Sequence, residues 1–170
     1  MLLTKERKQK LEETYQFYLH HEAILKMQEI PAHRGSNVYL HTFKLVKKVM
    51  KKAVKSRKNL DLENLLMATI LHDYYLYNWR IMKDRPQCHA KYHPGVAAKN
   101  AKRDFNISDK AVDMMMTHMW PFNFKNPPKG REAWLLNKAD TWVAFVECLT
   151  TKSYKKKKAD KYLSYISTLF

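Results

Sequence analysis

The chain has few of the residues that form tight turns or covalent cross-links. Its 170 residues include 3 glycines, 6 prolines and 2 cysteines. The two cysteines, Cys88 and Cys148, make neither a disulfide framework nor a Cys-x-x-Cys metal knuckle. Scarce glycine, together with abundant leucine, alanine, methionine, lysine and glutamate, favours helices over a sheet rich in turns. The composition therefore predicts an all-α protein.

Long apolar runs are also missing. No run approaches the roughly 18 residues that a membrane-spanning helix requires. The chain begins Met-Leu-Leu-Thr-Lys-Glu-Arg-Lys, and charges this early are incompatible with the apolar region of a secretory signal peptide. We therefore expect a cytoplasmic protein without a membrane partner. The length is that of one domain, which can bury about two-thirds of its unfolded surface.

Acidic residues are half as frequent as basic ones. The chain has 16 Asp and Glu against 32 Lys and Arg, a formal charge of +16, with a run of four lysines at 155–158. Such a field attracts phosphorylated ligands and polyanions in general. No zinc finger, RNP sequence or basic zipper specifies nucleic acid, and lysine-rich solvated helix faces explain the charge equally well. Nucleic acid stays open as a partner on charge alone, and nothing indicates an oligomeric state.

Apolar residues recur at helical spacing along the chain. The expected helices cover 4–29, 38–53, 62–73 (with Asn59 or Asp61 as its start signal), a stretch opened by His93-Pro94, a stretch capped by Ser108 and ended by Pro121, 131–149, and a basic stretch 152–170. Residues 74–92 are expected to form a long, partly ordered loop. We expect residues 1–170 to form a single-domain helical bundle of about six to eight helices. Its core would span 33–145, with helices 4–29 and 152–170 packed on it.

Histidines and aspartates occupy apolar or terminal positions on five of these helices. The pair His72-Asp73 ends the apolar run 65–71, where charged side chains have no role in packing. Asp140 lies in an apolar helix, where a carboxylate is costly to bury unless it is paired or bound to metal. Imidazoles and carboxylates together are typical ligands of transition metals. The complete candidate set is His41, His72, Asp73, His93, His118 and Asp140.

Single members of this set also have structural interpretations. His93 could simply open its helix, and His118 could end one, where the helix dipole favours a cation. Asp140 could pair with Lys138 or Arg131. The metal hypothesis is favoured because packing does not explain all six residues together.

The order of these residues resembles that of the HD-domain superfamily of metal-dependent phosphohydrolases. The likeness spans residues 33–145. It implies that His41, His72, Asp73 and Asp140 bind one metal, and that Asp73 bridges to a second metal held by His93 and His118. The segments that carry the likeness are Tyr39-Leu40-His41-Thr42, Ile70-Leu71-His72-Asp73, His93-Pro94-Gly95-Val96-Ala97-Ala98, Thr117-His118-Met119 and Asn137-Lys138-Ala139-Asp140.

The resemblance implies a fold of the HD-domain type and hydrolysis of a nucleotide or another small phosphate ester by a metal-activated water, with Asp73 as catalytic residue. The ligand types suit one or two divalent ions of Mn, Fe, Co, Ni or Zn better than Mg, which favours oxygen ligands. Several cations and histidines could hold phosphate, some of them in the loops that should border the pocket, although a solvated position explains each of them equally well. These candidates for substrate binding are His33, Arg34, Arg80, His89, Lys91 and Lys138.

The segment after His72-Asp73 departs from the better-known subfamilies. Residues 74–78, Tyr-Tyr-Leu-Tyr-Asn, contain no carboxylate, whereas alarmone hydrolases and nucleoside 5'-monophosphatases resemble one another in placing acidic residues there. No Gly-Tyr-Pro follows the fourth helix, which argues against cyclic-dinucleotide phosphodiesterases. The overall pattern is most similar to small bacterial HD-domain hydrolases. Three alternatives stay open: a non-catalytic metal- or ligand-binding regulatory domain, a basic nucleic-acid-associated hydrolase, and a di-iron oxygenase.

Overall fold

The computed structural model describes residues 3–33, 35–84 and 87–149, and this part of the chain is helical apart from its connections. The prediction of an all-α bundle is confirmed. One isolated β-bridge, between Pro31 and Asn37, is the only extended pairing among the described residues. The expected helix 152–170 lies outside them. The helices are α1 (Lys5–His20), α2 (Glu22–Leu25), the 3-10 helix η1 (Lys26–Glu29), α3 (Val38–Val54), α4 (Leu62–Leu71), α5 (His89–Phe105), α6 (Asp109–Thr117) and α7 (Gly130–Leu149).

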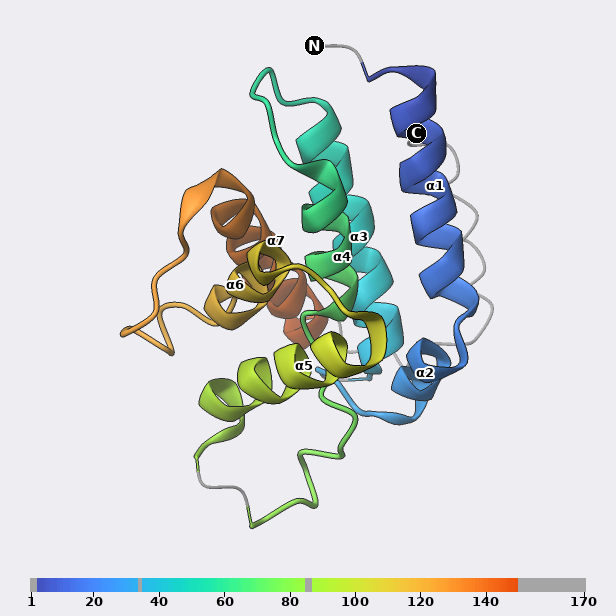
Figure 1. Cartoon of the computed structure of the whole chain (residues 1–170). Coiled ribbons are helices and arrows are strands. Elements are labelled where there is room, and N and C mark those ends of the chain that lie inside the picture. Colours follow the sequence, from blue (N-terminus) through green and yellow to red (C-terminus); the bar gives the residue numbers. More distant parts are fainter. Residues whose placement is uncertain (1–2, 34, 85–86, 150–170) are drawn as a thin grey trace.

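Helix α4 lies in the middle of the bundle (Figure 1). It contacts α1 and α3 on one side, α6 and α7 on the other, and α5 near its end. Most of its residues are buried, which explains why its sequence is apolar all round rather than along one stripe. Asp61 caps its start by accepting a hydrogen bond from the main-chain N–H of Asn64 at 3.2 Å. None of the described helices is both long and apolar enough to cross a membrane.

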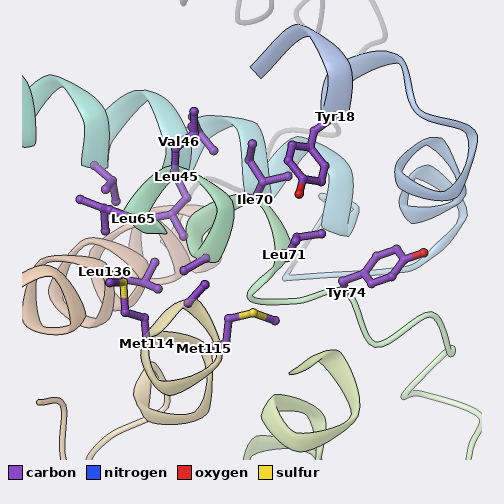
Figure 2. Close-up of a cluster of buried hydrophobic side chains, with 14 of the residues drawn as sticks. Tyr18, Leu45, Val46, Leu65, Ile70, Leu71, Tyr74, Met114, Met115 and Leu136 are labelled. Atoms are coloured by element: carbon purple, nitrogen blue, oxygen red, sulfur yellow. The ribbon is translucent and has the colours of Figure 1, made fainter. Parts of the chain in front are cut away.

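The core forms where α3, α4, α6 and α7 meet (Figure 2). Burying each large aliphatic side chain contributes about 1.5–3 kcal/mol, so this cluster fixes the four helices relative to one another. It thereby also fixes the ends of α4 and α6, which His72 and His118 follow directly. The buried residues labelled in the figure on these four helices are Leu45, Val46, Leu65, Ile70, Leu71, Met114, Met115 and Leu136.

The prediction of one helix over 4–29 was wrong. The chain breaks at His21, whose backbone is extended at φ −71° and ψ 129°. The Nδ1 atom of His21 accepts a hydrogen bond from the N–H of Ala23 at 3.2 Å and so starts α2. Histidine is not among the usual N-cap residues, so the sequence around His21 does not predict a new helix start there.

The prediction that His93 opens a helix was also wrong. Helix α5 begins at His89, so the last four residues of the expected loop 74–92 are helical and Pro94 lies inside the helix. Pro94 has no N–H to donate, which leaves one helix hydrogen bond unmade. Helix α6 starts as predicted, with Ser108 accepting from the N–H of Ala111 at 3.1 Å, but it ends at Thr117, before Pro121.

Candidate metal centre

All six predicted ligands come together at the end of α4. His41 comes from α3, His72 and Asp73 follow α4 directly, and His93 lies near the start of α5. The last two come from α6 and α7: His118 ends the former and Asp140 lies in the middle of the latter. The four histidines and Asp140 are buried, and the side chain of Asp73 is 13% exposed.

Asp73, His93 and His118 form one group of donor atoms. The Nε2 atom of His93 is 3.1 Å from Oδ1 of Asp73, and the Nε2 atom of His118 is 3.7 Å from the same oxygen. The two Nε2 atoms are 2.9 Å apart. One donor atom from each of the three residues lies within 4.8 Å of the others, so the group could hold a metal ion.

His41, His72 and Asp140 form a second group of donor atoms near Asp73. Oδ1 of Asp140 is 3.0 Å from Nε2 of His41 and 3.7 Å from Nε2 of His72. Oδ2 of Asp73 is 3.5 Å from the same His72 atom. Both the triad His41–His72–Asp73 and the triad His72–His118–Asp140 could hold a metal ion. The carboxylate of Asp73 therefore lies between two sets of donors, with one oxygen toward each.

Main-chain carbonyls set the ring orientation of three of the histidines. Because a carbonyl oxygen only accepts hydrogen bonds, each Nδ1 beside one carries a proton, and each Nε2 is the nitrogen that faces the centre and could bind a metal. Metal-bound histidines have this arrangement. The Nδ1 atoms of His72, His93 and His118 lie 2.9, 2.8 and 2.6 Å from the carbonyl oxygens of Thr69, His89 and Met115 respectively.

Two buried atoms of the centre, Nε2 of His72 and Oδ1 of Asp73, make no hydrogen bond of acceptable geometry among the described residues. Oδ1 of Asp73 does lie 3.1 Å from Nε2 of His93, whereas Nε2 of His72 lies 3.5 Å from Oδ2 of Asp73. Buried polar atoms are nearly always paired in proteins, so an unpaired one requires an explanation such as a bound ion. Burial, together with the nearby His93 and His72, lowers the pKa of His118 to about 4, which keeps that ring neutral and able to donate a lone pair.

His41 is held between two carboxylates instead. Its Nε2 faces Asp140, and its Nδ1 lies 2.9 Å from Oε2 of Glu147. Burial alone would lower the pKa of His41, but the hydrogen bonds and charges of the two carboxylates raise it to about 10. Burial likewise opposes ionisation of Asp140, yet His41 and the other histidines lower its pKa to about 2. Metal binding at Nε2 of His41 would therefore displace a proton.

Sequence analysis missed two residues of this centre, Asn137 and Glu147. The Nδ2 group of Asn137 donates to the carbonyls of His118 and Trp120 at 2.7 and 2.6 Å, which fastens the end of α6 to α7. Both missed residues are buried polar groups three residues before and seven residues after Asp140. That spacing places all three on one face of a helix, and it was the signal that could have identified them.

Two of the expected phosphate-binding residues lie beside the centre. His33 is half-buried, and its ring centroid is 5.1 Å from that of His41. Burial and the neighbouring His41 lower its pKa. His89 is stacked between Trp79 and His93, with centroid distances of 5.2 and 4.5 Å.

The other expected residues lie further out or outside the described part of the chain. Arg80 is exposed, lies over the ring of Trp79 at 5.3 Å and donates to the carbonyl of Ala32 at 3.3 Å. Lys91 is exposed and lines a surface cavity of about 400 Å³. Lys138 is exposed above the ring of Trp134 at 5.3 Å. Arg34 lies outside the described residues.

The segment after Asp73 is fastened to the segment before α3. The Nε1–H of Trp79 donates to the carbonyl of Pro31 at 2.8 Å, next to the bond from Arg80 to Ala32. The Tyr77 hydroxyl lies 3.0 Å from Nδ1 of His89. Through these contacts, residues 77–80 lie beside His89, whose ring stacks on that of His93.

Comparisons with known proteins identify no relative. No family model, no curated protein and no solved structure matches the chain. Membership of the HD-domain superfamily therefore stays a prediction, and the chemistry of the centre follows from its own geometry. That geometry supports a buried cluster of imidazoles and carboxylates that could hold a metal ion.

Proposed function

We propose that the protein is a metal-dependent phosphohydrolase with an HD-domain type of ligand arrangement. One observation carries the proposal: six ligand-type side chains from five helices converge, and three of the histidines have Nε2 turned inward by main-chain carbonyls. Burying this many polar donors is costly unless they bind something. Three imidazoles whose Nε2 atoms face a shared carboxylate suit a metal centre better than they suit packing.

We further propose two ions that share Asp73. The first would be held by His41, His72, Asp73 and Asp140, and the second by Asp73, His93 and His118, as the distances group them. Because each set mixes imidazole with carboxylate, Mn, Fe, Co, Ni or Zn fits better than Mg. A transition-metal cofactor of one or two ions follows from this assignment.

A divalent metal in such a site activates a water and offsets negative charge on phosphoryl oxygens. The protein's own residues would position the reactants. Asp73 is the proposed catalytic residue because its two oxygens reach both sets of donors. His33, half-buried beside His41, would hold a phosphoryl oxygen. The net charge of +16 favours an anionic substrate, and we propose a nucleotide or another small phosphate ester as substrate and the cytoplasm as location.

The test is hydrolysis of a panel of phosphate esters by the full chain. The panel would contain p-nitrophenyl phosphate, its diester and common nucleotides, each with Mn, Fe, Co, Ni or Zn after removal of bound metal with a chelator. We expect turnover that requires metal and is abolished by Asp73→Ala. Asp113→Ala, an exposed aspartate on α6, is the matched control and should retain the wild-type rate. Equal rates with and without Asp73 would contradict the proposal.

A second candidate is a non-catalytic metal- or ligand-binding regulatory domain. It is favoured by the absence of a carboxylate in residues 74–78, directly after His72-Asp73. Tyr75 in this segment is buried, with its ring 5.5 Å from that of His93. Burial and the charge of Asp73 raise the pKa of Tyr75, so its hydroxyl stays protonated and cannot serve as a base. Metal binding without turnover of any ester in the panel would favour this candidate.

A further inference from the structure

Glu147 is a buried carboxylate with a partner on each oxygen. It is 4% exposed, although it lies near the end of a helix whose neighbouring residues 145, 146, 148 and 149 are exposed. Oε2 accepts the Nδ1–H of His41 at 2.9 Å. Oε1 accepts the hydroxyl of Ser36 at 3.1 Å and forms an ion pair with Lys44. These contacts come from the segment before α3 and from α3 itself, and they hold the carboxylate in one orientation.

This contact distinguishes His41 from the other histidines of the centre. His72, His93 and His118 each give Nδ1–H to a neutral main-chain carbonyl, whereas His41 gives it to a carboxylate. Hydrogen bonds to an ionised acceptor are about twice as strong as neutral ones. A carboxylate on one ring nitrogen also makes the other nitrogen a more basic metal ligand.

We propose that Glu147 is a positioning residue of the metal centre. By accepting Nδ1–H, it directs Nε2 of His41 toward Asp140 and makes it the most basic of the four imidazole donors. The inference rests on the proposed function only in requiring that Nε2 of His41 binds a metal. Helix α7 then contributes two carboxylates with different roles. Asp140 would bind the metal, and Glu147 would orient His41, which binds the same metal.

The contacts of Glu147 suit an ionised carboxylate, as this role requires. Each oxygen faces a donor or a cation: Oε2 faces the Nδ1–H of His41, and Oε1 faces the hydroxyl of Ser36 and the ammonium group of Lys44. Lys44 lies on the oxygen that does not face His41, so it offsets the charge without competing for the Nδ1 proton.

An ion pair that only stabilises the fold would behave differently from a positioning residue. Loss of a purely structural pair lowers the unfolding temperature by the same amount with and without metal. Loss of a positioning residue lowers the affinity for metal, so the rise in unfolding temperature that the metal causes becomes smaller. The measured quantity must therefore be metal affinity, not stability alone.

The experiment compares Glu147→Gln with the wild-type full chain. Glutamine preserves the size of the side chain and removes its charge. Co²⁺ and Zn²⁺ would be titrated into metal-free protein by calorimetry in the presence of a competing chelator. We expect the ion bound by His41 to bind about 10–100-fold more weakly and the other ion to be unaffected. The matched control is Glu132→Gln on the same helix, whose carboxylate accepts from the N–H of Asp61 at 2.9 Å and should leave both affinities unchanged.

Two results would overturn the inference. One is Glu147→Gln with wild-type affinity for both ions, whatever happens to its stability without metal. The other concerns Ser36→Ala, which removes one partner of the carboxylate and replaces Glu147→Gln if that variant does not fold. We expect it to weaken the same ion several-fold, and unchanged affinity would contradict the proposal. Metal binding that depends on Glu147 in a protein without phosphatase activity would contradict the proposed function and leave this inference intact.

Discussion

Replacing Asp73 with asparagine should remove most of the stability that a divalent metal gives this protein. The two side chains have the same shape, so the fold around them is preserved. Asp73 presents Oδ1 to His93 at 3.1 Å and to His118 at 3.7 Å, and Oδ2 to His72 at 3.5 Å. A neutral amide is a much poorer metal ligand than a carboxylate. Both proposed ions therefore lose an anionic donor through one substitution.

The size of the effect follows from mass action. An ion at 100 times its dissociation constant stabilises the folded state by about 2.7 kcal/mol, so two ions supply about 5.4 kcal/mol. For a chain of this size, about 1 kcal/mol corresponds to roughly 2–4 °C, so the wild type should gain about 10–20 °C. If each site is weakened about 100-fold, the gain falls to about 0.4 kcal/mol per ion, or about 2–3 °C in total.

Differential scanning calorimetry would measure the gain. Each protein is compared with its own chelator-treated form, so that any change in stability without metal cancels. Asp113→Asn on α6 is the control, because this aspartate is exposed and distant in the sequence from every proposed ligand except His118. The reasoning would be refuted if Asp73→Asn gained as much as the wild type. A loss of about half the gain would show that Asp73 belongs to one site only.

Three further results are expected. In the metal-free protein, Glu147 has a pKa of about 2 against an ordinary value of 4.5, so its stabilising contribution is complete above pH 4.5 and is lost as the pH falls toward 2; urea unfolding should depend less on pH over this range in Glu147→Gln. Trp79→Phe removes the hydrogen bond to Pro31 and should cost about 1 kcal/mol, with faster amide exchange in residues 77–84, whereas slow exchange there would disprove the tether. Asn137→Ala leaves the carbonyls of His118 and Trp120 without this donor and should cost about 2–4 kcal/mol in urea unfolding; a cost below 1 kcal/mol would show that other groups satisfy them.

Local chemistry was enough to predict several helix boundaries and insufficient for others. Asp61 and Ser108 cap their helices as their side chains indicate, because an N-cap depends on residues three positions apart. The start of α5 was missed because proline favours the first helical turn, whereas here Pro94 lies inside the helix. The extra turn at the start of α5 contains His89, whose carbonyl oxygen accepts a hydrogen bond from Nδ1–H of His93. That requirement arises in the folded site and leaves no trace in local propensity.

The proposed metal ligands could be predicted from the sequence more completely than the residues that hold those ligands in position. Residues such as His72 and Asp140 stand out in sequence because they interrupt apolar segments. Glu147 also interrupts one, but its role depends on His41 and Lys44, more than 100 positions earlier in the chain. The spacing within α7 places Glu147 on the same face as Asp140, but it does not show which residues of α3 that face contacts. Side chains that bind a ligand can thus be inferred from residue type, while those that hold the binders in place require the fold.

The three carbonyls behind His72, His93 and His118 have a consequence for how substitutions affect this centre. Each carbonyl belongs to the residue three or four positions before the histidine it holds, and every residue type has one. The main chain therefore determines which ring nitrogen faces the centre, and this does not depend on the side chains of Thr69, His89 and Met115. Only His41 depends for its orientation on a distant side chain. In this centre, three ring orientations therefore depend on the path of the main chain, and the fourth depends on the side chain of Glu147.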